Sequence, residues 1–204
     1  MAARRRNLKK KKKKINFRKI LFVILLVFLG LYFFGKSTWD GKSKLTVAVA
    51  KDNGDVVLVN FDPSTRFISS IKIPKNTQTT VTHELGIWQI GSVWELGFSE
   101  GYKGELLSSS AMKTFGIPVE AWSSGSFLNF VDGNVFLGLI TRDTNLTLKD
   151  KIKLSRLILT TGSSAREKID MEDTGFLEST TLPGGAPGYI VKSGMPKSLM
   201  KILF

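Results

Sequence analysis

The 204-residue sequence contains no cysteine and a single histidine, His83. The absence of cysteine excludes disulfides, thiol catalysis and thiolate metal sites, so the fold must be stabilised by its core. His83 has no histidine or cysteine partner with which to hold zinc. We therefore interpret it as a surface or turn residue and not as a general base.

Acidic residues are missing from the first nineteen positions, where eleven Lys and Arg residues lie between Arg4 and Lys19. The formal net charge is +13, but residues 20–204 hold 19 basic and 17 acidic residues, a net charge of only +2. The basicity therefore belongs to the tail. Because the tail lacks interleaved aromatic residues and any DNA-binding fold, we expect no nucleic-acid partner. We expect it to lie on anionic lipid headgroups.

Charged residues are also missing from residues 20–34, which form a continuous apolar run. At about 1.5 Å per residue the run covers about 22 Å of a hydrocarbon core roughly 30 Å thick, and the stems of Arg18 and Lys19 can extend the helix. Tyr32 and Trp39 then fall near the far headgroup layer. The one-sided basic flank predicts a single-pass anchor in the cell membrane, with the N-terminus cytoplasmic and the rest extracytoplasmic.

A cleaved secretory signal is the main alternative to this anchor. It requires small residues at a cleavage site, and residues 35–39 offer no such pattern. A buried core helix is a further alternative. The apolar residues at 200–204 leave open that the C-terminal part of the protein is incomplete. We divide the chain into a basic cytoplasmic tail (1–19), a transmembrane anchor (20–35), a linker (36–44) and one extracytoplasmic domain (45–204).

The outer domain begins with three predicted strands, at residues 45–50, 56–61 and 67–73. The turn residues between them make the connections short, which predicts a meander. The first two strands contain apolar runs, as is typical of strands buried on both faces beneath helices.

Helical and extended segments follow. We predict extended chain at 87–90 and a short helix at 92–98, with Trp88 and Trp94 in packing roles. Leu107, Ala111 and Phe115 recur at helical spacing and indicate an amphipathic helix with a core-facing stripe.

Residues 135–141 read as a further strand. Thr147 and Asp150 have the spacing of a capping box and predict a helix that continues through residue 159. Residues 160–181 are polar. The glycine-rich segment 182–188 is interpreted as a loop, and it lacks the Lys-Ser/Thr ending of a phosphate-binding P-loop.

Three segments resemble the opening half of the LytR-CpsA-Psr domain: residues 54–63, residues 71–77 and residues 104–119. That family shows an Asp before a strand, a hairpin that ends in Ile-Pro-Arg-Asp-Thr, and a helix that leads to a Gly-Ile-x-Val step. Its members also begin with a short cytoplasmic tail and one membrane helix. The resemblance covers about residues 45–122 and identifies the chain as a diverged or truncated relative.

The resemblance implies an α/β fold in which a mixed sheet is sandwiched by helices, here preceded by a single N-terminal transmembrane helix. It also implies an envelope protein that binds a polyprenyl-pyrophosphate-linked glycopolymer and transfers it, with Mg²⁺, to peptidoglycan. Asp55 matches the Asp on the metal side of the family's site. Lys75 matches the Arg of the Pro-Arg-Asp-Thr step, and Asn76 matches its Asp.

The sequence departs from the family at two of these positions. Lysine keeps the charge of Arg but loses its planar fork, and asparagine removes a carboxylate. The family's later Arg-rich segment has no counterpart, because Arg142, Arg156 and Arg166 are isolated. We therefore expect weak or lost transferase activity. An active phosphotransferase that uses Asp55 and Lys75, and a non-enzymatic interaction domain on a signal anchor, are the alternatives.

Overall fold

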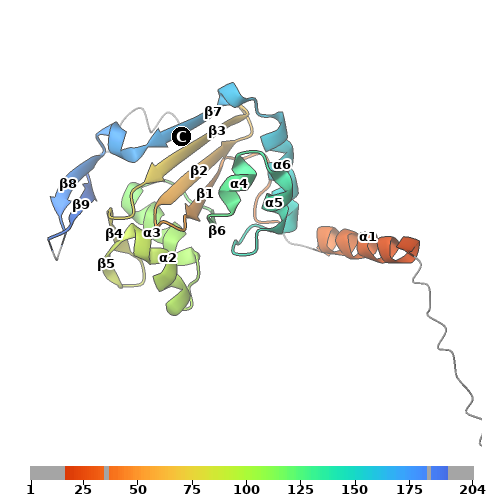
Figure 1. Cartoon of the computed structure of the whole chain (residues 1–204), viewed down its shortest axis with the longest axis horizontal. Coiled ribbons are helices and arrows are strands. Elements are labelled where there is room, and N and C mark those ends of the chain that lie inside the picture. The colour runs from red at the N-terminus through yellow and green to blue at the C-terminus, as the bar shows by residue number, and fades with distance from the viewer. Residues whose placement is uncertain (1–16, 35–36, 183–184, 193–204) are drawn as a thin grey trace, which may run out of the picture. The chain divides into compact units, whose positions relative to one another are not determined.

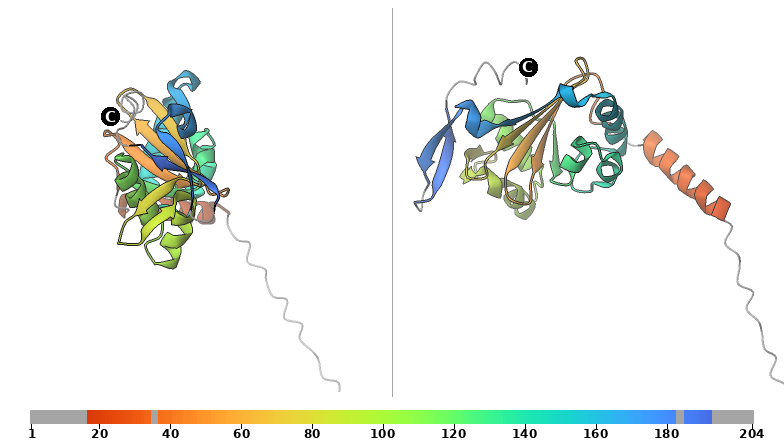
Figure 2. Two further views of the ribbon diagram at one scale, coloured as in Figure 1. Left: turned by 90° about the vertical axis from the view of Figure 1, so that its left-hand side faces the viewer. Right: turned by 45° about the horizontal axis from the view of Figure 1, so that its top comes forward.

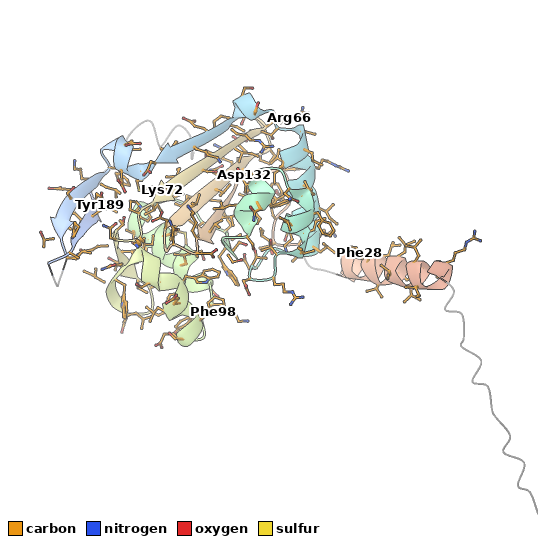
Figure 3. All side chains as sticks on the ribbon, viewed as in Figure 1. Phe28, Arg66, Lys72, Phe98, Asp132 and Tyr189 are labelled. Atoms are coloured by element: carbon orange, nitrogen blue, oxygen red, sulfur yellow. The ribbon has the colours of Figure 1, made fainter. Side chains whose placement is uncertain are left out.

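The computed structural model describes residues 17–34, 37–182 and 185–192, and the chain divides into two compact units after Gly35. The first unit contains helix α1 (Phe17–Phe34), from which apolar side chains such as Phe28 project into the surroundings (Figure 3). No helix within these described ranges combines the length and hydropathy needed to cross a membrane. The basic residues before position 17 and the apolar residues 200–204 lie outside the described residues.

The second unit is built on a mixed five-stranded sheet with the strand order β6-β1-β2-β3-β7 (Figure 1). The three central strands are an antiparallel meander, while β6 runs parallel to β1 and β7 runs parallel to β3. The strands of this sheet are β1 (Leu45–Ala50), β2 (Val56–Asp62), β3 (Phe67–Ile73), β6 (Ala121–Ser124) and β7 (Arg166–Asp170). The three strands predicted first from the sequence are confirmed.

Helices and two hairpins surround this sheet. The helices are α2 (Ile90–Ser99), α3 (Glu105–Phe115), α4 (Phe127–Val131), α5 (Val135–Ile140) and α6 (Leu148–Thr160), with the short 3-10 helices η1 (Ser163–Ala165) and η2 (Met171–Thr174). The hairpins are β4 (Gln78–Val81) with β5 (Gly86–Gln89), and β8 (Leu177–Thr181) with β9 (Pro187–Val191).

The two faces of the sheet carry separate hydrophobic cores. Alternate residues of β1 and β2 point to opposite faces, so that Ala48 and Leu58 pack against α2 and α3, while Val47 and Val59 pack against α4 and α6. The helices therefore form layers on both faces, as Figure 2 shows from two further directions. This arrangement confirms the predicted α/β class and its mixed sheet between helices.

The predicted helices are also confirmed in position. α3 buries Leu107, Ala111 and Phe115 and ends at Gly116, whose φ of 67° allows the left-handed cap. In α6 the capping box is complete, because the Thr147 hydroxyl accepts from Asp150 N and the Asp150 carboxylate accepts from Thr147 N.

The predicted strand at 135–141 is wrong, because Val135–Ile140 forms α5. The side chain of Asn134 accepts from Leu137 N and caps this helix. Gly138 lies against the ring of Phe130, where an added Cβ would come within 2.0 Å of a ring atom. Close packing between α4 and α5 therefore outweighs the strand preference of the local sequence.

The polar segment 160–181 contains two strands that its composition did not indicate. β7 pairs with β3 along one edge and carries charged side chains at alternate positions, including Arg166, Lys168 and Asp170. An edge strand is partly solvated, so it can be polar. His83 lies in an exposed turn with φ of 59°, as expected, and its ring stacks on Tyr102 at 4.2 Å.

Candidate functional site

The strand directions gather several charged residues at one end of the sheet. β1, β3, β6 and β7 all end there, and β2 begins there. Asp55 comes directly before β2, and the registers place Lys72 beside Val57 and Asp170 beside Lys72. The carboxyl ends of strands in α/β folds are the usual place for ligand sites.

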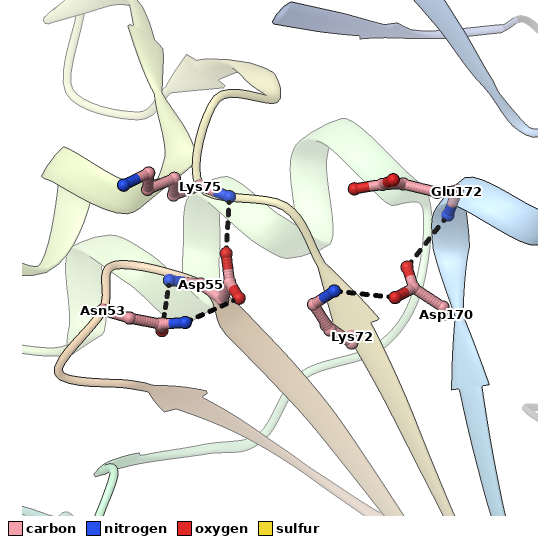
Figure 4. A network of polar contacts seen from close by, with 6 residues as sticks. All are labelled: Asn53, Asp55, Lys72, Lys75, Asp170 and Glu172. Atoms are coloured by element: carbon pink, nitrogen blue, oxygen red, sulfur yellow. Dashed lines mark hydrogen bonds and ion pairs between the residues drawn. The ribbon is translucent and has the colours of Figure 1, made fainter.

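The structure brings the two predicted site residues together, but through the main chain of Lys75. Lys75 N donates to Asp55 Oδ1 at 3.1 Å, and Asn53 Nδ2 donates to Asp55 Oδ2 at 2.9 Å. The ammonium of Lys75 is directed away from Asp55 (Figure 4), and its side chain is exposed. Asp55 therefore fixes the turn after β3 and leaves the Lys75 cation accessible.

Two glycines allow α2 to approach this turn. Gly91 N donates to Lys75 O at 3.0 Å, and a Cβ on Gly91 would lie 2.7 Å from Lys75 Cβ and 2.9 Å from Gly54 O. Gly54 has a φ of 87°, which favours glycine. Lys75 is thus held between the β1–β2 turn and the beginning of α2.

Asn76 has a structural role in place of the carboxylate that the resemblance implied. Its Nδ2 donates to Pro187 O at 2.9 Å, and its main-chain oxygen accepts from Tyr189 N at 3.2 Å. Because a carboxylate cannot donate to a carbonyl, asparagine suits this position better than aspartate. Asn76 therefore joins the turn after β3 to the β8–β9 hairpin.

Sequence reasoning did not identify Lys72, Asp170 and Glu172 as members of the site. Lys72 Nζ lies 2.7 Å from Asp170 Oδ2, and Glu172 N donates to Asp170 Oδ1 at 3.2 Å (Figure 4). The hydrogen bond to Asp170 raises the pKa of Lys72. Burial disfavours the ionised form of Asp170, but the bonds from Lys72 and Glu172 N outweigh it and lower the pKa of that carboxyl.

Tyr189 of the β8–β9 hairpin belongs to the same electrostatic environment. The negative charge of Glu172, followed by burial and by that residue's hydrogen bond, raises the pKa of Tyr189. The phenol is therefore neutral at physiological pH. It adds a hydroxyl to a site that also contains the side chains of two lysines, two aspartates and one glutamate.

Two hollows lie at this end of the sheet, and Lys72 lines the first of them. The first, which we call the α4 groove, has a volume of about 380 Å³, and the second, beside the β1–β2 turn and α2, has about 330 Å³. Both volumes are in the range of small-ligand sites. The α4 groove is lined by Lys51, Val57, Ser70, Lys72, Leu128, Val131, Asp132, Lys168, Ile169, Asp170 and Asp173. Its lining is mixed, with equal numbers of lysines and aspartates.

The three isolated arginines do not complete the site. Arg166 begins β7, whereas Asp170 ends it, and its guanidinium donates to Val131 O and Ile158 O, each at 2.8 Å. Arg166 therefore ties the sheet to α4 and α6. Arg156 lies on the exposed face of α6, and Arg142 is exposed after α5.

The carboxylates near Asp55 do not form a metal centre by themselves. Among the residues that the structure describes, no three His, Cys, Asp or Glu side chains are grouped to hold a metal ion. Both oxygens of Asp55 already accept a hydrogen bond. Mg²⁺ usually keeps several waters and is bound by one or two carboxylates together with substrate phosphates, so Asp55 would supply only a small part of its ligands.

No protein-family model matches the sequence, and no curated protein matches it. Several solved structures do match this chain. Bacillus subtilis TagT aligns with 82% of this chain and 91% of its own, at 15% identity and a TM-score of 0.54. B. subtilis TagV aligns with 79% and 94%, at 9% identity and a TM-score of 0.55.

A third structure is the LytR-CPS2A-psr family protein YwtF (TagT) from the same organism, with bound octaprenyl pyrophosphate lipid. It aligns with 82% of this chain and 90% of its own, at 16% identity and a TM-score of 0.54. The likeness therefore extends well beyond the segment that carried the sequence resemblance. The described residues of the second unit therefore have the fold of the LytR-CpsA-Psr proteins.

Proposed function

We propose that this chain is a membrane-anchored, extracytoplasmic protein of the cell envelope that binds a polyprenyl-pyrophosphate-linked glycopolymer and has weak or lost transferase activity. The observation that carries the proposal is the position of Lys72, Lys75 and Asp55 at the one end of the sheet where β3 ends and β2 begins. The fold is the one in which a solved TagT structure holds octaprenyl pyrophosphate.

The two lysines are suited to the pyrophosphate. Lysine binds phosphate as a point charge, and the exposed ammonium of Lys75 is accessible to a ligand. Lys72 is 40% exposed and paired with Asp170, so a pyrophosphate would compete with that carboxylate. This competition favours modest affinity.

The same features argue for weak transfer chemistry. Stabilising the charge of a phosphoryl transition state needs cations placed in advance, and Arg forks do this better than lysines. Lys72 is committed to Asp170, and Asn76 is committed to the β8–β9 hairpin. Asp55 is the residue that would hold Mg²⁺, which would supply positive charge to neutralise the pyrophosphate. Peptidoglycan would be the acceptor of whatever transfer persists.

The anchor is part of the proposal. The apolar side chains from Ile20 to Leu29 in α1 are 42–60% exposed, which is unfavourable in water, and the preceding sequence is basic. We expect residues 20–35 to hold the chain in the cell membrane, with residues 1–19 on anionic headgroups at the cytoplasmic side. Protease added to intact cells should digest residues beyond 36 and spare the basic tail. The reverse pattern would overturn this topology.

Ligand binding tests the function directly. The full chain in nanodiscs should bind a short polyprenyl pyrophosphate, and the double variant Lys72→Met/Lys75→Met should lose most of the affinity in titration by fluorescence. Lys113→Met is the matched control, because Lys113 is an exposed lysine on α3 outside the site. If the double variant and the control bind equally, these lysines do not hold the ligand. If the wild type does not bind, the interaction-domain alternative takes its place.

An assay of glycopolymer transfer distinguishes weak transferase activity from none. The wild type should release little polymer from a lipid-linked glycan in the presence of Mg²⁺ and peptidoglycan. Efficient turnover that is abolished by Asp55→Ala would instead identify an active phosphotransferase. Because Asp55 also fixes the Lys75 turn, Asp55→Asn, which keeps an oxygen that can accept from Lys75 N, should accompany it.

A further inference from the structure

The chain that enters the second unit is bound tightly to the beginning of α6. The carboxylate of Asp150 is fully buried and accepts from Ser37 Oγ, from Thr38 N at 3.0 Å and from Trp39 N at 3.2 Å. Lys153 Nζ donates to Ser37 Oγ at 2.9 Å. Trp39 itself is buried in the core. Residues 37–39 are therefore a fixed part of the domain and not a free tether.

This attachment leaves little chain between the domain and α1. Only two residues separate Phe34, where α1 ends, from Ser37 in the sequence. An extended chain spans at most about 3.5 Å per residue, so Phe34 and Ser37 are within about 10 Å of each other in any conformation. If α1 is held in a membrane, the first turn of α6 must lie close to that membrane's surface.

An exposed apolar helix is joined to this same turn. Lys151, the next residue after Asp150, is buried and donates to Thr141 O at the end of α5. On α5, Phe136 is 71% exposed and Ile140 is 56% exposed, and their spacing of four residues places them on one side of the helix. α5 and α6 lie side by side in Figures 1 and 2.

The exposed side of α6 is basic. Its basic residues are the exposed Arg156 and the half-buried Lys149 and Lys153, of which Lys153 donates to Ser37 and Trp39 O; Ile152 is exposed, and the single acidic residue, Asp150, is buried. Basic residues beside exposed apolar ones are typical of helices that lie at a lipid surface, where the charges contact phosphate headgroups and the apolar side chains enter the acyl boundary. The charge of α6 therefore suits an anionic leaflet.

We propose that the surface formed by Phe136 and Ile140 of α5 and by Ile152 and Arg156 of α6, the α5–α6 face, docks on the outer leaflet of the membrane that holds α1. The proposal rests on the anchor proposed above. It would orient the domain on the bilayer and limit its rotation. The occupant is a lipid surface because the chain's own connection brings this end of the domain to the membrane and because Arg156, the charged residue of the face, is positive.

Site-directed labelling can test this, because the chain has no native cysteine. The full chain carrying Ile140→Cys with a fluorescent label is reconstituted in phosphatidylglycerol vesicles. Glu178→Cys, at an exposed position of β8, is the matched control. The label at 140 should be quenched by brominated lipid and be several-fold less accessible to aqueous iodide than the label at 178. Adding Phe136→Asp should restore iodide access at 140, whereas Ile190→Asp in β9 should not.

The outcomes separate the docking from the anchor. If alkaline extraction releases the protein from the vesicles, both proposals are overturned. If the protein stays with the vesicles but position 140 is as accessible to iodide as position 178, only the docking is overturned. Protection from iodide without quenching by brominated lipid would show that a second copy of the chain covers the face, which also overturns the lipid assignment.

Discussion

Two carboxylate clusters at different places in the domain show how burial distinguishes a structural centre from an open site. Asp150, at the start of α6, is fully buried and accepts hydrogen bonds from Ser37, Thr38, Trp39 and Thr147. The side chain of Asp170, at the end of β7, is 30% exposed and forms an ion pair with Lys72. The first cluster has no capacity left for a ligand, whereas the second can exchange its partners.

The largest effect is expected when the buried cluster is broken. Asp150→Asn removes a buried negative charge and turns an NH₂ group towards donors such as Thr38 N and Thr147 N. We expect a loss of about 3 kcal/mol in the free energy of unfolding, measured by urea denaturation of the full chain in detergent. Asp143→Asn, at an exposed position, should change it by less than about 0.5 kcal/mol. Equal losses of unfolding free energy in the two variants would show that the buried Asp150 is no more important for stability than an exposed carboxylate.

The pH dependence of the stability difference between the wild type and Asp150→Asn provides a second test of the buried carboxylate. Burial disfavours the ionised form of Asp150, but hydrogen bonds from Ser37, Thr147 and Thr38 prevail and lower its pKa. When folding lowers the pKa of a carboxyl group, the resulting stabilisation is complete above the pKa of the unfolded state, about 3.9. It is lost as the pH falls through the pKa of the folded state. The gap between wild type and Asp150→Asn should be constant from pH 7 to 5 and shrink below about pH 4. A gap that grows on acidification would show the opposite shift.

A glycine substitution tests whether the position of Lys75 in the candidate site depends on close packing. In Gly91→Ala the new Cβ would approach Lys75 Cβ and Gly54 O at less than 3.0 Å. Overpacking against main-chain atoms should cost about 2 kcal/mol and displace the Lys75 turn. Gly162→Ala is the control, because its nearest neighbour would be 3.8 Å away. Unfolding curves, together with pyrophosphate titration, would detect the two effects, and an unaffected affinity would mean that the position of Lys75 is unimportant.

The sequence predicted local features well and distant contacts poorly. The three central strands, the amphipathic stripe of α3 and the capping box of α6 were found because each depends on neighbouring residues. α5 was mistaken for a strand because its side chains Val135, Phe136 and Ile140 favour strands, while the close contact of Gly138 with Phe130 that decides the outcome is tertiary.

The candidate site shows the same limit. Asp55 and Lys75 were found through a resemblance that spans neighbouring segments, and the structure joins them by a hydrogen bond. Lys72 and Asp170 were missed because 98 residues separate them and neither lies in a recognisable spacing. The capping box of Thr147 and Asp150 was predicted from local spacing. The hydrogen bond from Ser37 to Asp150 was not, because 113 residues separate the two in the sequence.

The smallest effect on stability is expected at the exposed pair of Lys72 and Asp170. The difference in stability between changes at this pair and at Asp150 decides whether the pair is a ligand site or a structural contact. The side chains of Lys72 and Asp170 are 40% and 30% exposed, and pairs of this kind contribute at most about 1 kcal/mol. Lys72→Met should therefore change the free energy of unfolding by less than about 1 kcal/mol, while it removes one of the two cations for pyrophosphate. Asp170→Asn should be similarly mild but should increase the affinity, because it frees Lys72. If Lys72→Met proved as destabilising as Asp150→Asn, the pair would be structural, and the proposed ligand site would lose one of its cations.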